Sequence, residues 1–100
     1  MDQQKERFLN LRTYPARLTA EQTAWYLGFA PHDIPVLVSK GLLRSLGHPR
    51  QNTVKFFALA VLQDLRSDSK WLSRATDTVT EHWRAKNASR SGNDTLATAA

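Results

Sequence analysis

The chain of 100 residues contains no cysteine. This absence excludes disulfide bonds, thiolate catalysis, and zinc or iron–sulfur sites with cysteine ligands. No stretch approaches the roughly 18 consecutive apolar residues of a membrane-spanning helix, which argues against an integral membrane protein. The opening residues, MDQQKERFLN, mix charges without an apolar run, so we expect no secretory signal there. One small soluble domain, located in the cytoplasm, is the resulting expectation.

Positive charge is in excess and is unevenly placed. The net charge is +5 and the isoelectric point is near 10.1. Most of the excess lies in residues 31–58, where four basic residues face Asp33 as the one acidic residue. Such a balance favours an anionic partner, most often nucleic acid, although a solvated basic surface would give the same composition. The four basic residues are Lys40, Arg44, Arg50 and Lys55.

Changes in composition divide the chain into four segments. Residues 1–17 have one apolar cluster and form either a short helix or an arm laid on the core. Residues 18–66 hold the punctuated, apolar-patterned part and form the main domain. Residues 67–86 continue as a C-terminal helix. The tail 87–100 is small and polar, so we expect it to be disordered because it cannot bury enough apolar surface.

Two helices separated by a tight turn are predicted at the start of the main domain. Thr19-Ala-Glu-Gln22 fits a capping box, and Gly28 is a suitable C-terminal stop for the helix that follows it. A second, short helix lies between Pro31 and Ser39. Because Pro35 lacks an amide and suits only a first turn, this helix should begin near residue 32 or 33. Gly41 ends it.

A small β-hairpin and two more helices are predicted next. Residues 42–46 and 53–57 have strand-like composition, and residues 47–52 between them are rich in turn formers. Helical spacing returns at 58–66. Ser67 or Asp68 can cap a last helix to about Lys86. The chain is therefore predicted to be mainly α, a winged helix-turn-helix (helix-turn-helix, short β-hairpin wing, helix) with an additional C-terminal helix.

The residues of this region resemble the excisionase and MerR-like winged-helix superfamily. The resemblance covers residues 18–66 and rests on three short stretches: Leu27-Gly28-Phe29 at the turn, Gly41-Leu42-Leu43 opening the wing, and Lys55-Phe56-Phe57 closing it. It implies a small bacterial regulator of transcription, or an architectural factor, that binds double-stranded DNA. The helix at 31–40 would enter a groove, and the basic wing at 44–55 would contact mainly phosphates.

The resemblance also implies which side chains would contact DNA. From the second helix these are His32, Asp33, Val36, Ser39 and Lys40, and from the wing Arg44, His48, Arg50, Gln51, Asn52 and Lys55. The acidic residue is the exception in this set. Asp33 near a phosphate would weaken binding unless it caps the helix or accepts a hydrogen bond from a cytosine.

No arrangement of residues typical of an enzyme is present. The sequence lacks a Ser–His–acid pattern, a glycine-rich phosphate loop and a paired carboxylate tract. The three histidines are far apart and have no metal-ligand spacing, so we expect no metal site and no cofactor.

The last helix permits two interpretations. Trp71, Ala75, Val79 and Trp83 follow a helical i+4 spacing. They either close the domain's own core or form a homodimer interface, and we favour a mixed case in which the first turns pack internally and Trp83 is left for a partner. The alternative to DNA binding is a protein–protein interaction module with the same fold, which the acidic residue and the prolines of the second helix would favour.

Overall fold

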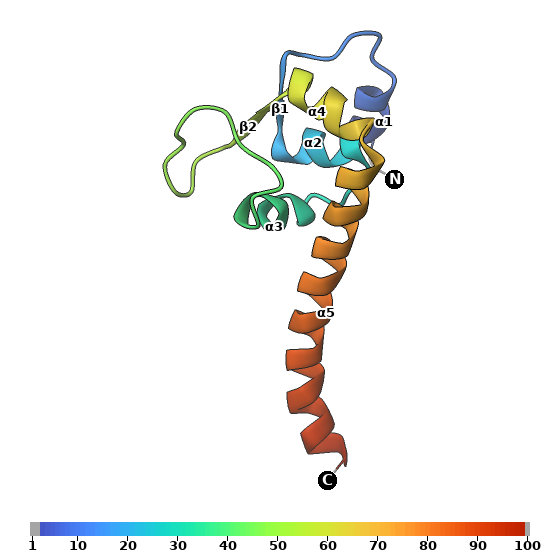
Figure 1. Ribbon diagram of the computed structural model, residues 1–100, viewed down its shortest axis with the longest axis vertical. Coiled ribbons are helices and arrows are strands. Elements are labelled where there is room, and N and C mark those ends of the chain that lie inside the picture. The colour runs from blue at the N-terminus through green and yellow to red at the C-terminus, as the bar shows by residue number, and fades with distance from the viewer. Residues whose placement is uncertain (1–2, 100) are drawn as a thin grey trace.

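The computed structural model describes the backbone of residues 3–99 and the side chains of residues 3–88. The fold is mainly helical with a small two-stranded antiparallel sheet, and a long last helix projects from the domain (Figure 1). In chain order the elements are α1 (Gln3–Leu9), β1 (Arg17–Thr19), α2 (Ala20–Leu27), α3 (Asp33–Ser39), β2 (Phe56–Ala58), α4 (Leu59–Arg66) and α5 (Ser69–Ala99).

The capping box at the start of α2 is formed as predicted. The backbone N–H of Gln22 donates to Thr19 Oγ1 at 3.2 Å, and the backbone N–H of Thr19 donates to Gln22 Oε1 at 3.1 Å. At the other end, Gly28 adopts the left-handed φ of 91°, and its N–H donates to the carbonyl of Ala24 at 2.8 Å. Both ends of α2 are thus fixed by local sequence.

The short second helix also begins at residue 33, as predicted from the position of Pro35. α3 starts at Asp33, so Pro35 occupies the first turn, where no intrahelical bond needs its missing N–H. Gly41 has a φ of 78° and turns the chain after the helix. The helix at 58–66 is confirmed as α4 to within one residue.

The prediction of a hairpin strand at 42–46 is wrong, because the described residues between α3 and β2 form no strand. β2 instead pairs with β1, with Leu18 opposite Phe57. Residues 42 and 43 are held elsewhere, because the N–H groups of Leu42 and Leu43 both donate to the carbonyl of Leu37 at the end of α3, at 2.9 and 3.2 Å. A single bond, from the N–H of Leu46 to the carbonyl of Phe56 at 2.8 Å, joins this segment to β2. Residues 42–55 are therefore a loop.

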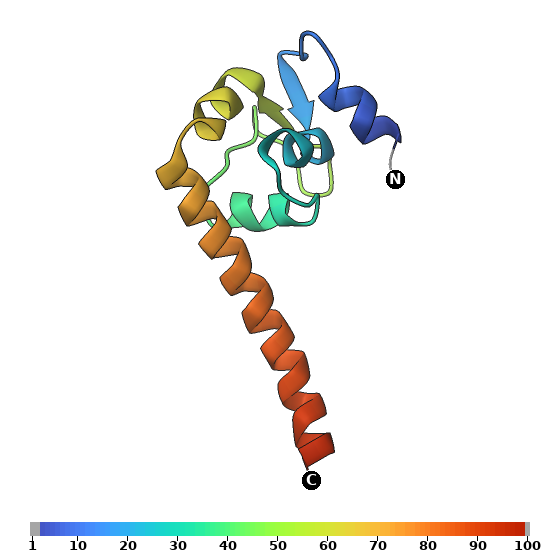
Figure 2. The same cartoon turned by 90° about the vertical axis from the view of Figure 1, so that its right-hand side faces the viewer.

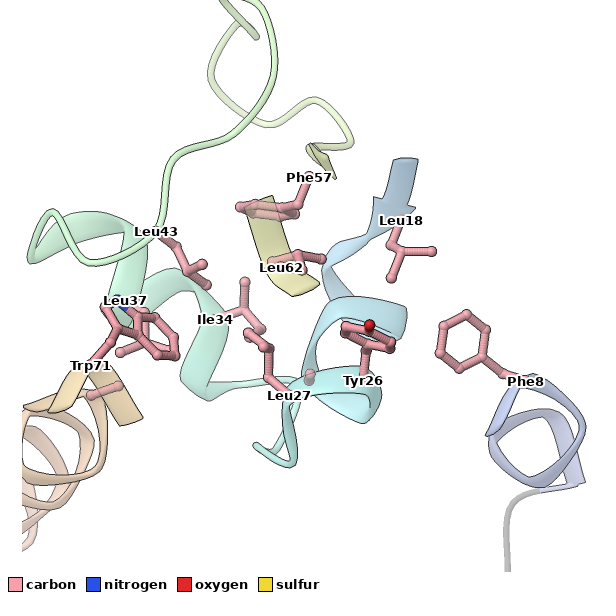
Figure 3. Packing of buried hydrophobic residues seen from close by; sticks show 12 residues of the cluster. Phe8, Leu18, Tyr26, Leu27, Ile34, Leu37, Leu43, Phe57, Leu62 and Trp71 are labelled. Atoms are coloured by element: carbon pink, nitrogen blue, oxygen red, sulfur yellow. The ribbon is translucent and has the colours of Figure 1, made fainter. Parts of the chain in front are cut away.

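One hydrophobic core joins all the elements (Figure 3). Its most enclosed large side chains are Leu18, Ile34, Leu37, Phe57 and Leu62, each no more than 1% exposed. Phe8 of α1 joins the edge of this core beside Tyr26, with Tyr14 packed on both rings. Residues 1–17 therefore contain a short helix, which is the first of the two alternatives left open by the sequence.

The last helix is longer than predicted. The backbone N–H of Trp71 donates to Asp68 Oδ1 at 3.1 Å, so Asp68 caps α5 as expected. The helix then continues past Lys86 to Ala99 and takes in most of the segment for which we predicted no structure. No proline follows Pro49, and Gly92 is the one glycine in the tail, so the sequence contains no strong stop. The side chains beyond residue 88 lie outside the described residues.

Replacing Thr19 by alanine is expected to lower the free energy of unfolding by about 1 kcal/mol, because one amide of α2 loses its acceptor. For a domain of this size that corresponds to a fall in melting temperature of about 4–8 °C. Thermal unfolding followed by circular dichroism measures it. Thr19→Ser keeps the hydroxyl and should restore most of the loss; an equal loss in both variants would rule out the cap as the cause.

Candidate nucleic-acid interface

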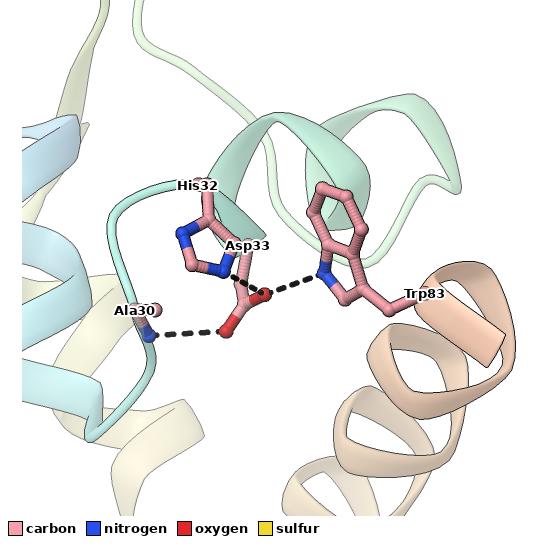
Figure 4. Close-up of polar contacts among 4 residues, drawn as sticks. All are labelled: Ala30, His32, Asp33 and Trp83. Carbon is pink, nitrogen blue, oxygen red and sulfur yellow. Dashed lines mark hydrogen bonds and ion pairs between the residues drawn. The ribbon is translucent and has the colours of Figure 1, made fainter. Parts of the chain in front are cut away.

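The position of α3 depends on the side chain of Asp33. Asp33 is 7% exposed, and its two carboxylate oxygens are used in different directions (Figure 4). Oδ2 accepts from the backbone N–H of Ala30 in the turn at 3.0 Å, and Oδ1 accepts from Nε1–H of Trp83 on α5 at 2.8 Å. One carboxylate therefore ties the turn, the start of α3 and the middle of α5 together.

Two histidine rings surround the same tryptophan. His32 packs edge-on against Trp83 with ring centroids 5.1 Å apart, and His82 does so at 4.7 Å. Nε2 of His32 also lies 3.7 Å from Asp33 Oδ1. Histidines that are 50 positions apart in sequence thus meet at one indole. Among the described residues, no three potential ligands gather in a way that could hold a metal ion.

α5 also holds the far end of α3. The side chain of Trp71 is 7% exposed, and its Nε1–H donates to the carbonyl of Leu42, just after α3, at 3.0 Å. Trp83 therefore holds the first turn of α3, and Trp71 holds the chain just after its end. Two indole N–H groups, each with one acceptor, set the orientation of this short helix.

Two of the residues expected to face DNA do not reach the surface. Asp33 and Val36 are 7% and 6% exposed. Asp33 is directed into its hydrogen bonds with Ala30 and Trp83, and Val36 packs in the interior because it lies on the inner side of α3. The expectation that these two side chains enter a groove therefore does not hold. Asp33 accepts from the turn and from α5 instead of capping α3, so its charge is directed to the interior.

The remaining predicted residues of α3 share its exposed side. His32, Ser39 and Lys40 are exposed, and Pro35 lies between them. The hydroxyl of Ser39 donates to the carbonyl of Val36 at 2.9 Å, so part of its hydrogen-bonding capacity is used within the helix. This face consequently offers one imidazole and one ammonium group as its strong polar groups.

The loop at 42–55 carries the other predicted residues away from the core (Figure 1); in Figure 2 it is viewed along the direction in which it extends. A turn closed by Thr53 shapes its tip: the backbone N–H of Thr53 donates to the carbonyl of Arg50 at 3.2 Å, and Asn52 takes a left-handed φ of 69°. Lys55 is half-buried, and the other members are exposed, namely Arg44, His48, Arg50, Gln51 and Asn52.

The basic side chains of this region have no acidic partner. Among residues 3–88, no carboxylate lies within ion-pair distance of Lys40, Arg44, Arg50 or Lys55. The one acidic residue of the segment, Asp33, is committed to the interior. The positive charge of Arg44, Arg50 and Lys55 is therefore available to an anion from solution, whereas Lys40 lines a hollow that Asp77 and Glu81 also line.

Arg17 is a basic residue of this region that the sequence did not single out. It starts β1, is exposed, and lies over the ring of Phe56 with its guanidinium carbon 4.0 Å from the ring centroid. The pairing of β1 with β2 brings it beside the end of the loop. No local pattern signals a pairing between two three-residue strands so far apart in the chain.

The three residues proposed for a dimer face their own domain. Trp71 is buried, Val79 is half-buried and packs on the core, and Trp83 is hydrogen-bonded to Asp33. Trp71 and Val79 therefore pack on the domain's own core, and Trp83 is held by Asp33 of the same domain. A homodimer through the last helix stays a prediction.

Comparison of the chain with protein-family models, with curated proteins and with solved structures gives no match. Within the part of the chain that the structure describes, none of the helices combines the length and the apolar character needed to cross a bilayer. The function therefore has to be argued from the geometry of the side chains described above.

The bond between Asp33 and Trp83 is expected to couple the two residues energetically. Asp33→Ala, Trp83→Phe and the double variant form a double-mutant cycle. Phenylalanine is chosen because it keeps an aromatic ring but removes the N–H donor. The double variant should be less destabilised than the sum of the single variants, by about 1–2 kcal/mol. Urea unfolding followed by circular dichroism measures the three changes. Additive effects would show that the contact does not hold α3 to α5.

Proposed function

We propose that the protein binds double-stranded DNA, mainly through phosphate contacts made by the loop at 42–55 and the C-terminal end of α3. Its biological role would be that of a small bacterial regulator of transcription or an architectural factor. The observation that carries the proposal is the set of unpaired basic side chains at Lys40, Arg44, Arg50 and Lys55, together with the withdrawal of Asp33 from the same surface.

The arrangement of elements supports the same proposal. α2, a tight turn and α3 follow one another, and the loop extends from the end of α3 (Figure 1). A short helix and a basic loop displayed together suit a groove and its flanking phosphates. This is the winged helix-turn-helix reading of the fold, with an irregular loop in the place of a two-stranded wing.

Binding of this kind depends more on charge than on base sequence. The exposed side of α3 offers His32 and Lys40 as its strong polar groups, and Ser39 already donates within the helix. Bidentate recognition of a base requires an arginine, asparagine or glutamine aimed at its edge, and in this region such side chains stand on the loop. We therefore expect counterion release to supply most of the affinity, with about 3–5 phosphates neutralised by each subunit.

The test is fluorescence anisotropy of a labelled random-sequence duplex over a salt series. The logarithm of the association constant should fall with the logarithm of salt concentration with a slope of about −3 to −4. Arg44→Ala/Arg50→Ala removes two phosphate contacts and should make this slope shallower by about 2. Both side chains are exposed, so the variant should fold normally.

The matched control is Lys70→Ala/Arg74→Ala, which removes the same charge from exposed positions at the start of α5. Its slope should stay within about 0.5 of the unsubstituted protein, since these residues lie outside the proposed interface. Equal effects of the two double variants would mean that only net charge matters. No binding at low salt, together with a salt-insensitive complex with a protein, would favour the interaction module.

A further inference from the structure

A cavity opens between the start of α2, α3 and the residues before β2. Its volume is about 450 Å³. Cavities of this size are in the range that binds small organic molecules, and a domain of this length has few of them. Three walls line it. The first is Thr19, Ala20 and Glu21 at the start of α2, the second is Ile34, Pro35, Val38 and Ser39 of α3, and the third is Thr53, Val54, Lys55 and Phe57 at the end of the loop and in β2.

The inner surface of the cavity is apolar. Ile34 and Phe57 are each 1% exposed and form its floor, where they belong to the hydrophobic core. Pro35 and Val38 continue the apolar surface along α3. Val54 stands at the third wall with 70% of its surface exposed, although nothing in the described fold requires an apolar residue there. A ligand with an apolar body would cover Val54 and gain the free energy of burying this surface.

One cationic group lines the same cavity without a partner. Lys55 is half-buried, and no carboxylate among residues 3–88 lies within ion-pair distance of it. A lysine whose stem lies along an apolar wall presents its ammonium group at the opening. Glu21 belongs to a different wall and lies in the first turn of α2, where its negative charge already interacts favourably with the helix dipole. Its presence disfavours a ligand with several negative charges.

We infer that this cavity binds a small amphipathic molecule that consists of an apolar ring system or chain and a single anionic group, with the anion directed to Lys55. The site does not rest on DNA binding, and its test contains no DNA. Because Lys55 is also one of the proposed phosphate contacts, occupancy of the cavity would compete with DNA for this one side chain.

The test uses two fluorescent probes that differ by one sulfonate group. 8-Anilinonaphthalene-1-sulfonate has an aromatic body and one sulfonate, and N-phenyl-1-naphthylamine has the same body without it. The 100-residue chain should bind both at one saturable site, with the sulfonate probe tighter by about two- to fivefold, as expected for a partly exposed ion pair. In Lys55→Ala this difference between the probes should disappear, whereas Lys55→Arg and Lys70→Ala should keep it.

A second pair of variants locates the site. Val54→Asp places a carboxylate on the apolar wall. It should weaken binding of the sulfonate probe at least about fivefold and binding of the neutral probe to a smaller extent. Val61→Asp is the matched control, because Val61 is also an exposed valine, 52% exposed, but lies on α4 away from the cavity. Amide shifts in ¹H–¹⁵N spectra should change for residues 19–21, 34, 36–39 and 53–57 on binding.

Three results would overturn the inference. Equal weakening in the two aspartate variants would place the probes elsewhere on the surface. Equal affinity for the two probes in the unsubstituted protein would remove the preference for an anion. Non-saturable binding, or shift changes outside the named residues, would mean that the cavity is not a ligand site. Circular dichroism of Val54→Asp confirms that the variant is folded before its affinity is interpreted.

Discussion

The carboxylate of Asp33 is the group on which the arrangement of helices depends. A charged group that is withdrawn from water is costly unless donors satisfy its oxygens, and here one donor is the backbone of the turn and the other is the indole of Trp83. Neither donor can move away without leaving the charge unpaired. The turn between α2 and α3 and the packing of α5 are therefore set together by a single side chain.

The need to satisfy the carboxylate of Asp33 also explains why α5 belongs to the domain. Its two tryptophans hold the two ends of α3, one through Asp33 and the other through the carbonyl of Leu42, and Ala75 between them is fully buried. A seven-residue helix is too short to be stable alone and takes its stability from such contacts. The basic loop that follows starts from this fixed point, because Leu42 and Leu43 are bonded to Leu37.

Local signals in the sequence were sufficient to predict four of the helices, since capping residues, glycines and a proline mark their ends. They did not predict the sheet, because β1 and β2 are three residues each and pair over a long separation, and because Leu42 and Leu43 are held by α3 instead of extending into a strand. Exposure of the loop residues followed from composition. The burial of Asp33 did not, since its partner Trp83 lies 50 positions away.

Clamping at both ends also restricts how α3 could adapt to a partner. Because α5 is bonded to the first turn of α3 and to Leu42 just after it, a tilt of the helix strains these two indole contacts. If duplex DNA is the partner, the adjustment of shape falls on the nucleic acid. Preference among sequences would then come from how easily a groove widens or a base step bends, and flexible pyrimidine–purine steps would be favoured even at positions that no side chain touches.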